Sequence, residues 1–235
     1  AEDGIRDRDV TGVQTCALPI YENELANSTV IDALSYINTK LEESDECHVA
    51  LTGGTLGNLI ALYLAKELNK GNWSGLNIWW SDERYLPYSS ADRNDLVFVN
   101  QIDKKTEVEV HRTPFESDLQ SDAKLFSDQI SKVEIDLIIL GMGPDGHVAS
   151  IFPGQQNIDE PRDAFAISDS PKPPSERITF SMNKLNKARE IWLVASGAAK
   201  AEVIATLVEG ESKLPVSQVS ITRLLVDSQA FGISE

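Results

Sequence analysis

Residues 135–154, IDLIILGMGPDGHVASIFPG, constrain the fold of this chain more than any other stretch. The run from Ile135 to Leu140 is apolar apart from Asp136, and it has the length and β-branched content of a buried strand. It leads into a glycine-rich turn that carries Asp145 and His147. Open α/β sheets place their chemistry at the carboxyl ends of their strands. We therefore expect a functional site at this turn.

Strands and helices alternate along the rest of the chain. The apolar patterns predict strands over residues 48–52, 76–80, 108–111, 135–140, 164–168, 177–182, 191–195 and 224–226. They predict helices over residues 27–41, 55–68, 92–101, 117–132, 183–188 and 198–208. The alternation in 177–182 is typical of a half-exposed strand. Strands separated by helices indicate crossover connections. We predict a single-domain, three-layer αβα fold with a mostly parallel, Rossmann-like sheet.

The first twenty residues, AEDGIRDRDVTGVQTCALPI, differ in character from the rest of the chain. They show neither helical nor strand periodicity, and their charges fall in the first nine positions. The segment is similar to translated sequencing-adapter sequence, and the alternative is an ordinary disordered N-terminus. We interpret residues 1–20 as non-native, exclude them from the fold, and assign the domain to residues 21–235.

Composition narrows the possible partners. The 235 residues carry a formal net charge of −16, which argues against attraction to nucleic acid or to anionic membranes. No apolar run reaches the roughly 18 residues of a membrane-spanning helix. Cys16 and Cys47 form no disulfide framework or metal-ligand pattern, and we expect a cytoplasmic protein. A small anionic ligand remains possible if arginine, lysine and backbone N–H groups bind it locally.

Three predicted strand ends have the same order of strand, tight polar turn and helix. They are Thr52-Gly53-Gly54-Thr55, Ser81-Asp82-Glu83-Arg84, and the turn from Gly141 to His147 with Gly143 and Gly146. Ser196-Gly197, which leads to Lys200, is a fourth candidate. Because the ends of parallel strands share one edge of a sheet, these turns can converge on one ligand.

Each candidate also has a purely structural interpretation. The Gly53-Gly54 turn opens a helix, with Thr55 as its predicted cap, so it can bind phosphate or simply turn the chain. Arg84 can bind phosphate while Asp82 or Glu83 bonds sugar hydroxyls, or the triplet can be a solvated turn. Arg177 and Lys200 taken singly are typical surface charges. Together with Arg84 they can offset a phosphate.

His147 is the strongest catalytic candidate, because the ordinary pKa of histidine suits proton transfer near neutrality. It follows Asp145 and two glycines at a strand end, whereas His48 and His111 lack such companions and have a structural interpretation. We predict no metal site, since no HxH, HExxH or CxxC pattern occurs.

The chain resembles the 6-phosphogluconolactonase family over residues 25–230. The matching segments are LTGGTLGNLIALYLA (51–65), IWWSDERYLPYSSADRND (78–95), DLIILGMGPDGHVASIFPG (136–154), KPPSERITFSMNKLNKA (172–188) and WLVASGAAKAEVI (192–204). The resemblance implies hydrolysis of 6-phosphoglucono-δ-lactone without a cofactor. Two departures stand out: the turn reads Gly-Gly-Thr-Leu-Gly where many members have Gly-Gly-Ser-Thr-Pro, and residues 1–20 stand where the family begins.

The resemblance also implies roles for the candidates. His147 is expected to activate water, with Asp145 orienting its ring and N–H groups of the 141–146 turn binding the oxyanion. Arg84, Arg177, Lys200 and the Gly53-Gly54-Thr55 turn are expected to bind phosphate, and Asp82 and Asn94 to contact hydroxyls. We expect a monomer or a small homo-oligomer.

Two rival functions remain open. The related glucosamine-6-phosphate deaminases carry a glutamate in the segment after the histidine, where this chain has Ser150-Ile151-Phe152-Pro153, and Arg84 stands where deaminases usually have tyrosine. Both differences favour the lactonase. A non-catalytic sugar-phosphate sensor is the third alternative. Such regulators usually carry a DNA-binding module, and the sequence indicates neither a helix-turn-helix nor a basic face.

Overall fold

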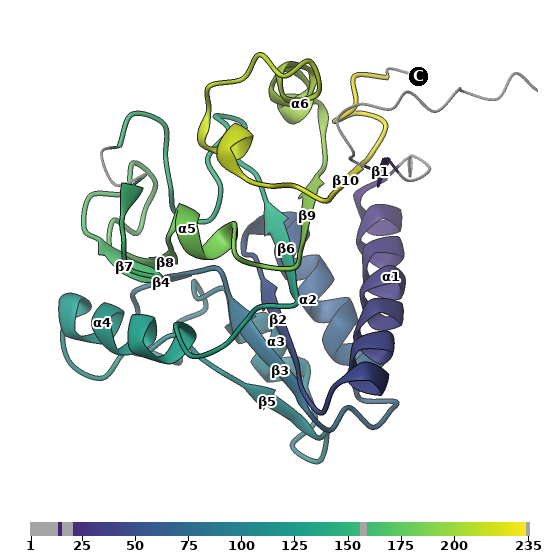
Figure 1. The fold of residues 1–235 in the computed structure, drawn as a ribbon, viewed down its shortest axis with the longest axis vertical. Coiled ribbons are helices and arrows are strands. Elements are labelled where there is room, and N and C mark those ends of the chain that lie inside the picture. The colour runs from purple at the N-terminus through teal and green to yellow at the C-terminus, as the bar shows by residue number, and fades with distance from the viewer. Residues whose placement is uncertain (1–13, 16–20, 156–158, 234–235) are drawn as a thin grey trace, which may run out of the picture.

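The structure is a computed structural model that describes residues 14–15, 21–155 and 159–233. A parallel sheet runs through its centre (Figure 1). Its strands lie in the order β1 (Gln14–Thr15), β10 (Arg223–Val226), β9 (Glu190–Ala195), β6 (Leu137–Gly141), β2 (Cys47–Leu51), β3 (Leu76–Trp80) and β5 (Val108–Val110). Every neighbouring pair is parallel, which confirms the predicted mostly parallel sheet.

A second, smaller sheet is antiparallel and was not expected from the sequence. It consists of β4 (Asp82–Arg84), β8 (Arg177–Phe180) and β7 (Ala164–Ile167), with β8 in the middle. In its register Arg84 lies opposite Arg177. The three residues of β4 are too few to show periodicity, so the sequence pattern could not indicate this pairing.

Helices cover both faces of the central sheet and give the predicted three layers. One face carries α1 (Glu22–Glu43), α2 (Gly54–Leu68) and α3 (Leu96–Gln101), which form one hydrophobic core with the strands. The other carries α4 (Leu119–Ile130), α5 (Met182–Leu185), α6 (Ala201–Val208), the short helix η3 (Pro215–Gln218) and the smaller sheet, which form a second core. Figure 1 shows α1 and α2 on one side of the sheet and α4 and α5 on the other.

Strand β6 shows how the sequence specifies this arrangement. Its side chains alternate between the faces, so Leu137 and Ile139 enter the core under α1 and α2, whereas Ile138 and Leu140 enter the core on the other face. All four are fully buried, and burying such side chains contributes about 1.5–3 kcal/mol each. A continuous apolar run is therefore what a central parallel strand requires.

Three local predictions were wrong. Helix α1 begins at Glu22, not near Asn27, because Leu25 and Ala26 already belong to its buried face. The N-cap of α2 is Gly53, and Thr55 makes no side-chain capping bond. Strand β8 is buried along its whole length, whereas its alternation predicted a half-exposed strand. Its polar positions lie against the turn after His147, where Thr179 accepts the Ser150 N–H.

The strand order of the central sheet reverses between β2 and β6. Connections from β2 lead outwards to β3 and β5, and the chain then returns to place β6 on the other side of β2. Ligands bind at such a switch point, outside the carboxyl ends of the two strands. Gly53 follows β2 and the turn carrying His147 follows β6, so the topology brings both predicted turns to this crevice.

The described residues test two further predictions only in part. No helix within the described ranges is both long and apolar enough to span a bilayer. Of the first twenty residues, only Gln14–Thr15 are described, as the edge strand β1 beside β10, and the rest lie outside the described residues. The interpretation of residues 1–20 as non-native therefore stays a prediction.

Candidate active site

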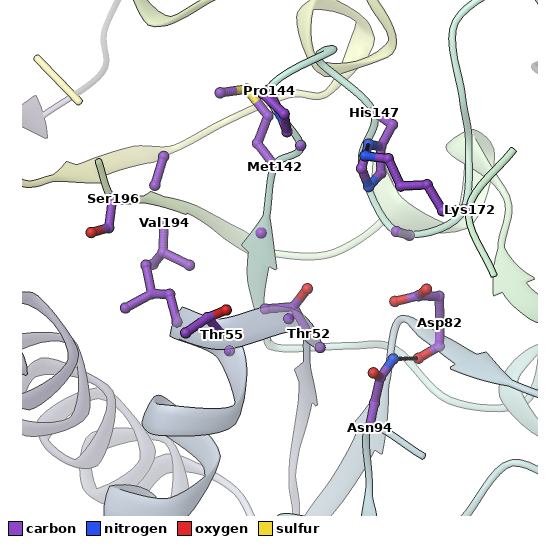
Figure 2. A pocket seen from close by; sticks show the side chains of 18 of the residues that line it. Thr52, Thr55, Asp82, Asn94, Met142, Pro144, His147, Lys172, Val194 and Ser196 are labelled. Atoms are coloured by element: carbon purple, nitrogen blue, oxygen red, sulfur yellow. Dashed lines mark hydrogen bonds between the residues drawn. The ribbon is translucent and has the colours of Figure 1, made fainter. Parts of the chain in front are cut away.

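A cavity of about 450 Å³ opens at the switch point. Ten of the predicted site residues line it: Gly53, Gly54, Thr55, Asp82, Arg84, Asn94, Gly143, His147, Arg177 and Lys200. Figure 2 shows His147 and Lys172 on one side, Thr55 and Ser196 on the opposite side, and Asp82 with Asn94 on the wall between β4 and the loop before α3. Three other predicted residues, Glu83, Asp145 and Gly146, lie outside the cavity lining.

His147 and Asp145 form a hydrogen-bonded pair at the end of the turn after β6. His147 Nδ1 lies 2.5 Å from Asp145 Oδ1, and the imidazole stacks on Phe152 with ring centres 4.5 Å apart. A carboxylate can only accept, so the proton between the two atoms belongs to Nδ1. This leaves the Nε2 lone pair available to take a proton. Asp145 thus has the orienting position that the sequence predicts, although it stands behind the cavity wall.

The electrostatics of the pair favour a neutral imidazole beside a carboxylate. Burial lowers the pKa of His147 below its ordinary value; the Asp145 charge opposes this shift and the Lys172 charge adds to it. Burial alone would raise the pKa of Asp145, but the hydrogen bond from His147 and the charges of His147 and Lys172 lower it overall. At neutral pH this arrangement supplies a general base.

The turn itself is built for this close packing. A Cβ on Gly143 would overlap both the His147 ring and the Asp145 carboxylate. Gly146 has a positive φ of 75° and packs on Leu214, so it shapes the turn and does not contact a ligand. The N–H groups of Gly143 and Gly146 donate to His147 O and Gly143 O, respectively. These two amides are therefore occupied within the turn, and the expectation that N–H groups of the 141–146 turn bind an oxyanion stays a prediction for its other amides.

Lys172 is a site residue that sequence reasoning missed. Its Nζ lies 3.4 Å from Asp145 Oδ1 and 3.2 Å from His147 Nδ1. It comes from the proline-rich loop before β8, whose position could not be inferred from periodicity. The available signal was its place in the segment KPPSERITF, which carries part of the family resemblance.

The opposite side of the cavity is the N-terminus of α2. Gly53 to Gly57 line the wall there, and the first N–H groups of a helix have no partner within the helix. These amides and the positive end of the helix dipole suit an anion. Thr55 makes no capping bond and its hydroxyl lies at the cavity, as Figure 2 shows. Thr52, the first residue of this predicted turn, also lines the wall, although the sequence indicated no binding role for it.

Lys200 completes this side from the short helix η2 (Ala198–Lys200), which follows β9. Burial lowers the pKa of Lys200, and the Lys172 charge acts in the same direction. The loop before it is held by Asp227: its carboxylate accepts the Ser196 hydroxyl at 2.5 Å and the Gly197 N–H at 3.0 Å. Asp227 is buried and had no sequence signal, because its contact with Gly197 depends on the adjacent ends of β9 and β10.

The smaller sheet supplies the charged wall. Asp82 is buried and accepts the Ser150 hydroxyl at 2.6 Å, and Arg177 Nη1 lies 3.8 Å from the same carboxylate oxygen. The Arg177 guanidinium also donates to Lys172 O and Pro174 O, which ties the proline-rich loop to β8. Arg84 lines the cavity and donates to Asp92 O. Sequence reasoning had not singled out Ser150 for this bridging role.

Asn94 lines the cavity, whereas Glu83 lies behind it. Asn94 Nδ2 donates to Asp82 O at 3.0 Å, and its Oδ1 is buried with no hydrogen-bond partner among the described residues (Figure 2). Glu83 was predicted to bind substrate. Instead, its carboxylate accepts the backbone N–H groups of Arg84, Asn94 and Asp95. Burial and the neighbouring Asp95 raise the pKa of Glu83 to about 7. Glu83 positions Asn94 and does not contact the cavity.

The charges around the cavity contrast with the acidity of the whole chain. Four cationic side chains line it, namely Arg84, Lys172, Arg177 and Lys200, against the carboxylates of Glu22 and Asp82. Asp82 is further neutralised by its contact with Arg177. Across the described ranges, no cluster of three or more histidine, cysteine, aspartate or glutamate side chains could hold a metal ion. The arrangement can bind an anionic molecule and remove a proton beside it.

Fold and pocket together define an α/β protein with a cation-lined cavity and a histidine–aspartate pair at the switch point of a parallel sheet. The family model described as glucosamine-6-phosphate isomerases/6-phosphogluconolactonase matches residues 21–226. The chain belongs to this family.

Individual relatives agree with this assignment. The chain is 31% identical over 194 residues to a 6-phosphogluconolactonase of Mycobacterium leprae, covering 75% of this chain and 78% of the relative. It is 34% identical over 204 residues to a probable 6-phosphogluconolactonase of Drosophila melanogaster, covering 81% and 83%. The predicted resemblance is confirmed.

Solved structures agree on the fold. The 6-phosphogluconolactonase of Thermotoga maritima superposes with a TM-score of 0.79 at 24% identity, covering 91% of this chain and 99% of that one. A monomeric glucosamine-6-phosphate deaminase superposes with a TM-score of 0.77 at 16% identity, covering 94% and 99%. Lactonase and deaminase therefore share this fold, and the side chains of the pocket must distinguish them.

Proposed function

We propose that this chain hydrolyses 6-phosphoglucono-δ-lactone to 6-phosphogluconate, the second step of the oxidative pentose phosphate pathway. The observation that carries the proposal is the position of the His147–Asp145 pair across one cavity from the N-terminus of α2 and Lys200. One side can accept a proton and the other can bind a phosphate. The relatives from Mycobacterium leprae and Drosophila melanogaster bear the name of this activity.

In the proposed mechanism, His147 Nε2 takes a proton from a water molecule, and the oxygen of that water attacks the lactone carbonyl carbon. The resulting tetrahedral intermediate carries a negative charge on the former carbonyl oxygen, which the cationic cavity wall stabilises. The bond from this carbon to the ring oxygen then breaks, and the imidazolium returns its proton to the ring oxygen. The product is the open hydroxy acid, which ionises in water. No cofactor enters, because an ester carbonyl is already electrophilic.

The binding roles follow from the two sides of the cavity. The Gly53-Gly54-Thr55 turn and Lys200 would bind the phosphate, with Arg84 as the further cation. Asp82 and Asn94 would accept hydrogen bonds from sugar hydroxyls, and the unpaired Oδ1 of Asn94 supports this role. Arg177 lies beside the Asp82 carboxylate and holds the proline-rich loop. We propose that the protein is a monomer or a small homo-oligomer.

We also propose a cytoplasmic location, where sugar phosphates are metabolised. Cys47, the one cysteine within the described residues, is a free thiol in the core. Burial raises its pKa to about 12, so the thiol is unreactive and compatible with a reducing compartment.

A deaminase function is less well supported by the side chains. The buried segment Val148 to Phe152 after the histidine contains no carboxylate that could assist ring opening of an amino sugar. The carboxylates of the cavity are Glu22 on α1 and Asp82, and Asp82 is bonded to Ser150.

The test measures hydrolysis of lactone freshly made from glucose 6-phosphate by a dehydrogenase. The purified full-length chain should exceed the spontaneous rate, and His147→Ala should lose nearly all of the excess. His111→Ala is the matched control: His111 stacks on Trp79 and does not line the cavity, so its loss should affect stability and leave kcat unchanged. Ammonia release from glucosamine 6-phosphate would establish the deaminase instead. Binding of 6-phosphogluconate without turnover would establish a sensor.

A further inference from the structure

The ammonium group of Lys172 contacts the two side chains to which the proposed function assigns the chemistry. Its Nζ lies within 3.4 Å of Asp145 Oδ1 and 3.2 Å of His147 Nδ1, and 5.8 Å above the ring of Phe152. His147 stacks on that same ring. Phe152 therefore fixes where the imidazole and the ammonium lie relative to each other.

Hydrogen bonds hold the backbone of Lys172 in place, and this positions its side chain next to His147 and Asp145. Its N–H donates to Ser170 Oγ, and its carbonyl accepts from the Ser170 hydroxyl at 3.0 Å and from Arg177 Nη2 at 3.0 Å. Arg177 belongs to β8 and is itself buried. The lysine thus extends from a tied loop, while its side chain is 42% exposed. Such a position tolerates substitution at the end of the side chain.

The 2.5 Å distance between His147 Nδ1 and Asp145 Oδ1 requires a proton between these two atoms, and this selects one arrangement of the three groups. An ammonium only donates and a carboxylate only accepts, so Lys172 Nζ and His147 Nδ1 both donate to Asp145. Proton transfer from His147 to Asp145 would replace the carboxylate next to Lys172 by a neutral acid. Protonation of Nε2 would place a second positive charge beside the ammonium. Both changes are disfavoured by Lys172.

Charged groups on neighbouring elements also face the imidazole, and they influence whether His147 carries a positive charge. Asp145 lies on its own turn, Asp82 on β4, Arg177 on β8, and Lys172 on the loop before β8; Arg84 and Lys200 line the same cavity. The two carboxylates favour a positive charge on His147 and the four cations disfavour it. Of these cations, Lys172 makes the contact with His147 Nδ1 itself.

We propose that Lys172 is a positioning residue that keeps the pair as Asp145 carboxylate and neutral His147, with the proton on Nδ1 and Nε2 free to accept one. This role rests on the proposed function, because it concerns the base of that same reaction. Its consequence is that the enzyme remains active at lower pH than a histidine–aspartate pair alone would allow. The direction of the His147 pKa, lowered by burial and further by Lys172, agrees with it.

The experiment measures the titration of His147 by NMR in the substrate-free full chain labelled at its histidine rings. Lys172→Met removes the charge but keeps an unbranched side chain over Phe152, and Lys172→Arg keeps the charge. His147→Gln identifies the resonance to be followed. Lys172→Met should raise the titration midpoint by about one pH unit, whereas Lys172→Arg should retain the wild-type midpoint. Lys172→Gln gives a second neutral variant if the methionine variant folds poorly.

Kinetics then connect the titration to the reaction. In the lactonase assay, the acid limb of kcat/KM should move upward in Lys172→Met by the same amount as the NMR midpoint and return in Lys172→Arg. A role confined to packing would lower stability without moving either midpoint. An unchanged midpoint in both neutral variants would overturn the proposal, even with lactonase activity intact. Absence of lactonase activity in the wild type would overturn the proposed function, and the NMR comparison would still test Lys172.

Discussion

Gly53 and Asn94 lie in direct contact across the floor of the cavity. A Cβ on residue 53 would overlap the side-chain amide of Asn94, with Oδ1 as the nearest atom. Asn94 is held from the other side, because its N–H donates to the buried carboxylate of Glu83 at 2.7 Å. Its side chain is buried and donates from Nδ2 to Asp82 O, so a displacement would break this bond. The close approach between α2 and the loop before α3 depends on the absence of a side chain at residue 53.

Gly53→Ala should therefore lower kcat/KM by about 10- to 100-fold, through displacement of Asn94 and of the α2 N-terminus. The backbone at residue 53 has φ −92°, which alanine accepts, so the effect comes from the contact. Gly210→Ala is the matched control. Its φ is 74° and no atom lies within 4 Å of the new Cβ, so it should cost about 1 kcal/mol of stability and leave KM unchanged. Wild-type kcat/KM in Gly53→Ala would contradict a role for this contact.

Asp145→Asn should change the pH profile in a direction opposite to Lys172→Met. Activity requires neutral His147 and is lost as the pH falls through the pKa of His147, which lies below its ordinary value. Since the Asp145 charge raises this pKa, its removal should move the acid limb of kcat/KM to lower pH. The maximal kcat should fall by about 100-fold or more, because the imidazole loses the group that fixes its tautomer. Asp118→Asn, an exposed helix cap, should keep the wild-type profile.

Asp227→Asn should raise KM and leave kcat nearly unchanged. The carboxylate accepts from Ser196 Oγ and from the N–H of Gly197, which fixes the loop that leads to Lys200. Loss of hydrogen bonds to a charged group costs about 1.5–3 kcal/mol, or roughly tenfold or more in binding. Steady-state kinetics with the lactone would measure this. Glu134→Gln, which removes an exposed ion pair with Arg189, is the control and should alter neither parameter. A fall in kcat alone would argue against a phosphate-binding loop.

Arg93→Met should destabilise the fold by about 1.5–3 kcal/mol, because the buried Asp95 would keep only Arg112 as its cationic partner, and the carbonyls of Leu86 and Thr113 would lose their donor. Arg93 is fully buried, donates to Asp95 from Nε and Nη2, and donates to Leu86 O and Thr113 O. Urea unfolding at neutral pH would measure the loss. Lys124→Met breaks an exposed ion pair with Asp128 on α4 and should cost no more than about 0.5 kcal/mol. Equal effects of the two substitutions would contradict the importance of burial.

Much of the parallel sheet could be predicted because its strands are apolar runs bounded by turns. The predicted strand 76–80 coincides with β3. For the other predicted strands of the central sheet, the last residue lies within about one residue of the last residue observed. The parts that could not be predicted depend on tertiary contacts. Nothing local in the three residues of β4 indicates that they pair with β8, and the burial of Arg177 and Thr179 depends on a turn from elsewhere in the chain.

In the site, too, the features that depend on local sequence could be predicted, and those that depend on tertiary contacts could not. Glycine turns and His147 at strand ends are visible in the sequence, because their chemistry and local conformation coincide. Glu83 was misplaced, since adjacent residues of a strand point to opposite sides and a triplet of charges does not show which side faces the ligand. Lys172 and Asp227 were missed because each acts through a partner distant in sequence, His147 and Ser196 respectively.

Arg84 pairs with Arg177, which lies far along the chain, and this determines when the cavity can form during synthesis on the ribosome. The side of the cavity built by β2 and the N-terminus of α2 belongs to the first third of the chain, whereas β8, Lys200 and Asp227 all come from its last third. A nascent chain that has emerged through α4 already holds the helix N-terminus but has neither its opposing wall nor its base. The cavity is therefore completed only late in synthesis, after β8 has paired with β4 and β10 has paired with β9.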